Sequence, residues 1–248
     1  MSNDEEPIVP VPEDAQMRVT DIFSFGGGLE RLQSDFRKEY DELVEAIEAN
    51  PAEEVFVKET KEASKSGKYL ASPGVMNHNI LIEQLHDEYG WAVDHSAGRN
   101  KSEISQIGKE PRSIGDSECE VDISPGERYG KRTVDAWKND FCVEIQFGKY
   151  AFMIYDVLAK FGHFQQHDKI EMGVEVLPSN NLVRDMSTGV GYYEQLEAEI
   201  GHLPDDYVDE EYRTPVIGLG VGFERPSIDH DDLESEAGVA SQQTVADF

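Results

Sequence analysis

The amino-acid sequence predicts a mixed α/β domain, in which a central β-sheet is flanked by helices. Three patterns support this prediction: helical apolar periodicity near the N-terminus, a β-hairpin signal in the middle of the chain, and two later strands separated by a helix. Because helices and strands alternate after the hairpin, we expect the strands to share one sheet that helices cover. A length of 248 residues favours one domain of moderate size with appendages.

The first half of the chain predicts two helices. An apolar stripe at three- and four-residue spacing runs through residues 29–47, and a second one runs through residues 76–89. Gly26-Gly27-Gly28 precedes the first helix and is expected to act as a hinge, since no strand is predicted before it and no P-loop lysine follows it. Residues 92–130 are polar and predict loops, with one short strand near residues 121–123.

The second half predicts the strands of the sheet. Asn139-Asp140 is a turn signal between two β-forming segments, residues 133–138 and 141–147, which together predict a hairpin. The elements expected after it are a helix over 149–163, a strand over 170–176, a helix over 187–200 and a strand over 215–223.

Composition and charge set limits on location and partners. Fifty-one acidic residues against 22 basic ones give a formal charge of −29, which ordinarily argues against nucleic-acid binding and against anionic membrane surfaces. No apolar run reaches the roughly 18 residues of a membrane span, the first residues do not resemble a secretory signal, and two cysteines form no disulfide framework. We therefore expect an intracellular, cytoplasmic protein without a membrane partner.

The acidic residues are spread along the whole chain. Residues 1–20 predict a disordered acidic arm, residues 21–226 a single domain, and residues 227–248 a disordered acidic tail. The first 14 residues carry five acids and no base, and the tail carries six acids and no base, so the residues between them still hold −18. Such a surface is typical of proteins from cytoplasm at multimolar salt, where repulsion is screened. We expect a halophilic source; the alternative is an ordinary acidic protein.

Three side chains of the hairpin form a candidate metal site. Asp135 lies on its first strand, and Glu144 and Gln146 lie two residues apart on the second, so that the latter two share one face. Pairing of the strands would bring Asp135 close to Glu144. Oxygen ligands of this kind suit Mg²⁺, which activates water and neutralises charge on a scissile phosphate. The alternative is that these are ordinary acids on an exposed strand face.

The local charge around these residues differs from that of the chain. Residues 128–149 hold five bases and three acids, a net charge of +2, and two of the three acids are the proposed ligands. A basic loop beside a carboxylate pair suits a polyanionic phosphodiester substrate. The alternative is that the bases simply mark exposed loops.

The same region resembles a known family. The segments VDAWKNDFCVEIQFGKYAFMIYD and GVEVLPSNNLVRDMSTGVGYYE, within residues 134–194, are similar to the BglII/BstYI-type restriction endonucleases, a branch of the PD-(D/E)XK nuclease superfamily. Most of that superfamily has lysine as the third motif residue, whereas this branch has glutamine, which corresponds to Gln146 here. The resemblance implies a restriction-endonuclease-like fold, with a mixed central β-sheet flanked by helices.

The resemblance also implies an activity and a set of site residues. It implies Mg²⁺-dependent hydrolysis of both strands of a short palindromic DNA site, with a GATC centre and 5′-phosphate ends, by a homodimer whose genetic partner is a DNA methyltransferase. Asp135 and Glu144 would be metal ligands together with the Ile145 carbonyl, and Gln146 would orient the attacking water. For a further upstream polar residue, Glu120 and Asp122 are candidates. The alternatives are a repair-type nuclease of low sequence specificity and a catalytically inactive DNA-binding or interaction protein.

Overall fold

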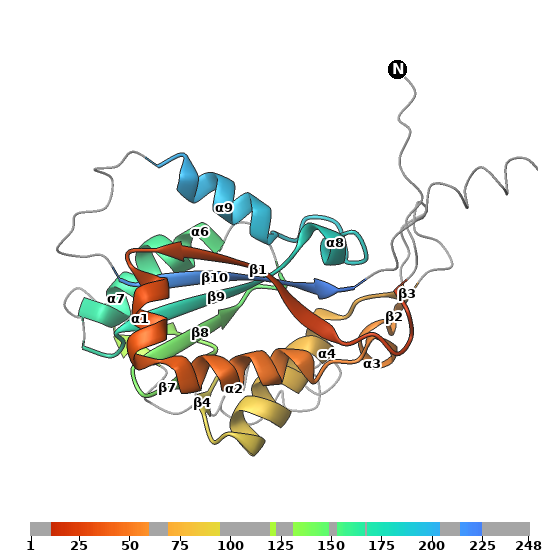
Figure 1. The fold of residues 1–248 in the computed structure, drawn as a ribbon, viewed down its shortest axis with the longest axis horizontal. Helices are drawn as coiled ribbons and strands as arrows, with labels where there is room; N and C mark the ends of the chain where they lie inside the picture. The colour runs from red at the N-terminus through yellow and green to blue at the C-terminus, as the bar shows by residue number, and fades with distance from the viewer. Residues whose placement is uncertain are drawn as a thin grey trace, which may run out of the picture.

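A six-stranded mixed sheet lies at the centre of the protein (Figure 1). The computed structural model describes residues 11–59, 69–94, 120–122, 131–148, 153–166, 168–203 and 214–224. Within them the strand order of this sheet is β1-β10-β9-β8-β7-β4. Its strands are β1 (Met17–Phe25), β4 (Ala92–Val93), β7 (Ala136–Lys138), β8 (Phe141–Ile145), β9 (Met172–Pro178) and β10 (Val216–Phe223). The central strands β8, β9 and β10 are parallel, and β1 and β7 pair with them in the antiparallel sense.

Helices cover both faces of the sheet, as Figure 1 shows, with α2 and α4 on one side and α6, α7 and α9 on the other. The helices of the N-terminal part are α1 (Gly28–Asp35), α2 (Arg37–Glu48), α3 (Ala52–Val55), α4 (Pro73–Asn77) and the π-helix η2 (His78–Glu88). Those of the C-terminal part are α6 (Met153–Tyr155), the π-helix η5 (Asp156–Lys160), α7 (Phe161–Gln166), α8 (Asn180–Val183) and α9 (Tyr193–Gly201). The predicted fold class is confirmed.

Two apolar clusters hold these layers together. One lies between the sheet and α2, α4 and η2, where Leu43 and Ile80 pack against strand residues such as Val174. The other lies under α7 and α9 and includes Phe161 and Leu196. Every residue of β8, β9 and β10 is buried, as expected for parallel strands that are covered on both faces. A charged side chain on these strands is therefore held away from water.

The N-terminal region differs from its predicted structure. Residues 17–20, which were assigned to the disordered arm, form the start of β1, the edge strand that pairs with β10. The hinge prediction was wrong in its premise, because a strand does precede the glycines: Gly26 and Gly27 have φ of 60° and 81° and turn the chain from β1 into α1. The helix expected over 29–47 is two helices, which meet at Phe36, where the backbone leaves the helical conformation.

The remaining elements match in type and differ in extent. The hairpin β7–β8, the strands β9 and β10, the short strand β5 (Glu120–Asp122) and the helix over 76–89 are all present; β5 pairs with β6 (Lys131–Thr133), and β2 (Lys58–Glu59) pairs with β3 (Tyr69–Leu70). The helix expected over 187–200 begins only at Tyr193, after the positive φ of Gly189 has interrupted the chain. The short helix α8 was not predicted. Residues 1–10 and the tail 227–248 lie outside the described residues.

Among the described residues, no helix has the length and apolar character that crossing a bilayer requires.

Candidate active site

The hairpin β7–β8 places Asp135 beside Glu144. Its two-residue turn, Asn139-Asp140, has φ of 50° and 64°, the left-handed conformation that tight hairpins require. Ala136 then pairs with Val143, so that Asp135 lies across from Glu144. The Ile145 N–H donates a hydrogen bond of 2.8 Å to the Asp135 Oδ2 atom. The structure therefore brings together the two carboxylates that the sequence pattern predicted to be neighbours.

Gln146 joins them on the same face of the sheet. Its Nε2 atom lies 3.5 Å from Oδ2 of Asp156, a residue of the π-helix η5 that covers this face. Glu144 is only 6% exposed and Asp156 only 4%, so the predicted alternative of acids on an exposed strand face does not apply. The neighbouring residue Ile145 is also buried and pairs with Val176 of β9.

The structure adds three charged residues to the predicted ones. On β9, Glu175 lies directly opposite Glu144 in the parallel register and is 0% exposed. On η5, Lys160 reaches down toward the sheet, and its Nζ atom lies 2.5 Å from Glu144 Oε1 and 3.3 Å from Asp156 Oδ1. We refer to Asp135, Glu144, Asp156 and Glu175 together as the acidic cluster; Lys160 is its cation.

The sequence pattern did not single out these added residues, although two weak signals were present. Glu175 alternates with apolar residues along its strand, which ordinarily indicates a solvent-facing side chain. In this fold both faces of β9 are covered, so the same alternation places Glu175 inside. Asp156 and Lys160 are four residues apart in an apolar helix, a spacing that puts an acid and a base on one helix face.

Burial changes the proton affinity of every carboxylate in the cluster for which a shift is resolved. Desolvation raises the pKa of Asp135 to about 6, although the Ile145 N–H and the Lys160 charge act in the opposite direction. Burial, followed by repulsion from Asp135, raises the pKa of Glu144 well above its ordinary value. For Glu175, burial and then the charges of Asp156 and Glu144 raise the pKa strongly. Burial lowers the pKa of Lys160, but the carboxylates outweigh it and the net shift is upward, so the ammonium stays charged.

The donor set of this cluster fits a hard divalent cation. Carboxylate oxygens and a backbone carbonyl are the ligands that Mg²⁺ prefers. Both carboxylate oxygens of Glu175 are buried without a hydrogen-bond partner among the described residues, so they are available to a cation. Within the described stretches, however, no group of three or more acidic, histidine or cysteine side chains is arranged so that it could hold a metal ion. The Lys160 ammonium instead occupies oxygens of Glu144 and Asp156, so metal binding requires these side chains to rearrange.

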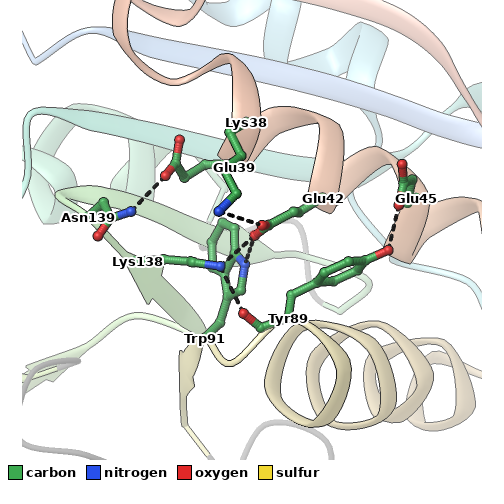
Figure 2. Close-up of polar contacts among 8 residues, drawn as sticks. All are labelled: Lys38, Glu39, Glu42, Glu45, Tyr89, Trp91, Lys138 and Asn139. Carbon is green, nitrogen blue, oxygen red and sulfur yellow. Dashed lines mark hydrogen bonds and ion pairs between the residues drawn. The ribbon is translucent and has the colours of Figure 1, made fainter.

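One base of the predicted basic window belongs to a different contact. Figure 2 shows that Lys138 points toward α2, where its Nζ atom lies 2.7 Å from Glu42 Oε2 and 2.8 Å from the Tyr89 carbonyl oxygen. The same Glu42 oxygen accepts a hydrogen bond of 2.8 Å from the Trp91 indole N–H. Lys138 therefore ties the hairpin to α2 and to the end of η2, and the prediction that it forms part of a phosphate-facing basic loop was wrong.

Other predicted residues cannot be placed at the site. β5 and β6 form a two-stranded sheet outside the six-stranded one, and the side chains of Glu120 and Asp122 are not described. The remaining bases of the window lie outside the described residues or have only their backbone described; they are Arg128, Lys131, Arg132 and Lys149. The nearest described base to the acidic cluster is thus Lys160, which lies outside that window.

Comparisons with known proteins identify the family and the fold of the chain. A model of the family described as "Restriction endonuclease BglII/BglIII" matches residues 20–206. A crystal structure of restriction endonuclease BglII complexed with a DNA 16-mer is similar in fold, with a TM-score of 0.53 and 18% sequence identity over 81% of this chain and 74% of that one. The structure of free BglII aligns with a TM-score of 0.49 and 18% identity, covering 84% of this chain and 81% of the other. The comparison with curated proteins gave no match.

Proposed function

The chain belongs to the BglII/BglIII restriction endonuclease family, and from that premise we propose that it cuts both strands of a short palindromic DNA site, with a GATC centre, using Mg²⁺. Membership makes it a type II restriction endonuclease, a nuclease that binds DNA and cleaves it at specific sites. The observation that carries the finer proposal is the pairing of the half-buried Asp135 with the buried Glu144 on adjacent strands, followed by Gln146 on the same face of the sheet.

In this proposal Asp135, Glu144 and the Ile145 carbonyl oxygen hold the divalent cation. When bound, Mg²⁺ supplies charge neutralisation at the scissile phosphate and lowers the pKa of the attacking water. The Ile145 N–H holds the Asp135 carboxylate in place through its 2.8 Å hydrogen bond, so one ligand is oriented before substrate arrives. The burial of these groups strengthens their electrostatic effect on a phosphate that enters the site.

Gln146 is proposed to orient the attacking water. Its carboxamide is tethered to Asp156 through Nε2, which leaves its oxygen to accept a hydrogen bond from water. The water attacks phosphorus and loses a proton to solvent, while the bond from phosphorus to the 3′ oxygen breaks. The 3′ oxygen takes up a proton from solvent to give a hydroxyl, and the phosphate remains on the 5′ oxygen. A glutamine carries no charge, so the positive charge near the cluster comes from Lys160 on η5.

We also propose an oligomeric state, a genetic partner and a cellular environment for the enzyme. Two symmetry-related cuts in a palindrome call for two sites related by the DNA two-fold axis, which a homodimer supplies. A DNA methyltransferase encoded with the nuclease would protect the host genome, and both would act in the cytoplasm. The formal charge of −29 supports a halophilic setting, in which phosphate contacts by lysine and arginine add little affinity and base contacts carry recognition.

A plasmid digest tests this function. The purified protein is incubated with Mg²⁺ over a range of KCl concentrations, and discrete fragments whose ends a ligase joins without added kinase are expected. Glu144→Ala should abolish cleavage, while Glu53→Gln, which alters an exposed acid on α3, should not. A smear of products would instead indicate a nuclease of low specificity. Absence of metal-dependent cutting at every salt concentration would overturn the proposal.

A further inference from the structure

Glu175 is a buried carboxylate to which the proposed reaction assigns no role. It is 0% exposed, and neither of its carboxylate oxygens has a hydrogen-bond partner among the described residues. Leaving a buried carboxylate unpaired is costly, because the charge loses its water without gaining a partner, so native proteins seldom retain one without a ligand. A leucine would fill the same place in β9 without that cost, which makes the presence of Glu175 informative.

The position of Glu175 connects it to the proposed metal ligands. Glu144 and Glu175 are Cα partners on the adjacent parallel strands β8 and β9, and Asp135 lies across from Glu144 on the other side. The three residues therefore form a row over three neighbouring strands, and adjacent strands of a sheet lie about 4.8 Å apart along the hydrogen-bonding direction. On the far side of Glu175 the partner in β10 is Gly218, which has no side chain to bind it.

Residues of η5 and α7 pack closely over β9 beside Glu175 without neutralising it. Two residues earlier on the same face, Gly173 lets the Phe161 ring approach so closely that a Cβ atom would lie 2.6 Å from it. Helix α7 thus packs tightly onto β9. The nearby cation, Lys160, contacts Glu144 and Asp156. No direct contact between Lys160 and Glu175 is seen among the described residues.

The net charge of the acidic cluster and Lys160 also favours a bound cation. With all groups ionised, four carboxylates and one ammonium sum to −3, an excess that a buried site cannot hold without added positive charge. One divalent cation reduces this to −1. A third carboxylate ligand is therefore compatible with the charge that the cation brings, and it uses oxygens that have no hydrogen-bond partner among the described residues.

We propose that Glu175 is a further ligand of the divalent cation, acting together with Asp135 and Glu144. This inference rests on the proposed function, because it concerns the same metal site. It makes a row of acids on three adjacent strands the metal-binding surface, in place of the hairpin alone. The Glu175 side chain would reach the cation from β9. This strand is connected to β8, which carries Glu144, by the helices α6, η5 and α7.

Calorimetric titration of the metal-free protein with Mn²⁺ alone tests the proposal without reference to cleavage. Glu175→Gln keeps the size of the side chain and should weaken Mn²⁺ binding at least about tenfold, since even residues behind the ligands contribute that much. Glu175→Asp keeps the charge but withdraws the oxygens, so binding should be weakened as well. Glu197→Gln, at an exposed acid on α9, should bind Mn²⁺ as the unmodified protein does.

Thermal unfolding in a chelator provides the second readout. If Glu175 serves the metal, its carboxyl group does not stabilise the metal-free fold, so the metal-free Glu175→Gln variant should melt at or above the temperature of the unmodified protein. A lower melting temperature together with unchanged Mn²⁺ affinity would show a purely structural role and overturn the inference. Unchanged Mn²⁺ affinity in both Glu175 variants would also overturn it.

The outcomes separate this inference from the proposed function. If Glu144→Gln loses Mn²⁺ binding while both Glu175 variants keep it, the metal site stands and only the role of Glu175 fails. If the unmodified protein does not bind Mn²⁺, the inference and the metal-dependent function fail together.

Discussion

Glu144 and Glu175 lie directly opposite each other on parallel strands, and both side chains are buried. Two carboxylates in such a position repel each other in a medium that screens charge poorly. Among the described residues, Lys160 is the cation that compensates them, through its 2.5 Å contact with Glu144. This repulsion destabilises the metal-free site, and we expect a bound divalent cation to reduce it.

Lys160 should stabilise the metal-free protein. Its side chain is only 13% exposed, and Lys160→Met removes the positive charge that contacts the acidic cluster. Breaking a buried pair from one side leaves the partner uncompensated, so the free energy of unfolding should fall by about 3 kcal/mol. Urea unfolding with and without Mg²⁺ checks this, because the cation should restore more stability to the variant than to the unmodified protein. Lys38→Met, at a side chain that is 75% exposed, is the control and should change little.

Asp135 should make the metal-free protein less stable as pH rises. Its pKa is about 6 in the folded state against an ordinary value of 3.8, chiefly because it is buried, with Asp94 and Asp156 adding repulsion and the Ile145 N–H and Lys160 opposing it. Between these two pKa values the folded state binds more protons at Asp135 than the unfolded state does. The contribution of Asp135 to the free energy of unfolding is therefore greatest below pH about 4 and is lost as pH rises through about 6. This difference corresponds to about 3 kcal/mol.

The measurement compares the unmodified protein with Asp135→Asn by urea unfolding in a chelator from pH about 4 to about 7. Asparagine can still accept the hydrogen bond from Ile145, so only the titration is removed. The free energy of unfolding of the unmodified protein minus that of the variant should fall as pH rises across this range. A difference that stays constant with pH would contradict the prediction.

Gln146 should affect the chemical step more than metal binding. Gln146→Ala removes a carboxamide held beside Asp156 but leaves Asp135, Glu144 and Glu175 in place. If it orients the attacking water, single-turnover cleavage at saturating Mg²⁺ should slow by roughly a hundredfold, the lower range for a positioned group in proton transfer. The Mn²⁺ affinity should change less than threefold or so. Equal losses in both quantities would instead make Gln146 a metal-binding residue.

Lys138 should contribute to stability and not to DNA affinity. It is held by Glu42 and by the Tyr89 carbonyl oxygen, as seen in Figure 2, and its Nζ atom lies 5.8 Å from the centroid of the Trp91 ring. Lys138→Met should lower the free energy of unfolding by about 1–3 kcal/mol, because the partly buried Glu42 carboxylate loses a hydrogen bond from a charged donor. The salt dependence of DNA binding should not change. A phosphate-contacting lysine would reduce the slope of log K against log salt by about 1.

The fold class and half of the site could be predicted because their signals are local. The β-forming composition of FCVEI, the Asn139-Asp140 turn and the two-residue spacing of Glu144 and Gln146 lie within one hairpin. Side-chain direction along a strand follows from its period of two, so the approach of Asp135 and Glu144 needs no knowledge of the rest of the molecule.

The other half depends on contacts between segments far apart in the chain. Glu175 meets Glu144 only because a helical crossover returns β9 beside β8, and a strand sequence does not specify which neighbour it will have. Lys160 reaches the acidic cluster only because η5 packs onto that same face. β1 was missed for a different reason: as an edge strand it has few buried residues, so Arg18, Thr20 and Asp21 weaken its apolar alternation.

The pairing of β1 with β10 has a consequence for how the enzyme is made. The hydroxyl of Thr20 donates to the carbonyl oxygen of Gly220, a contact that spans 200 positions of the chain. The first strand to leave the ribosome must therefore wait for the last one before the sheet edge can close, and such long loops slow folding. A nascent chain cannot complete this sheet before β10 has left the ribosome, so it lacks a finished nuclease fold until then.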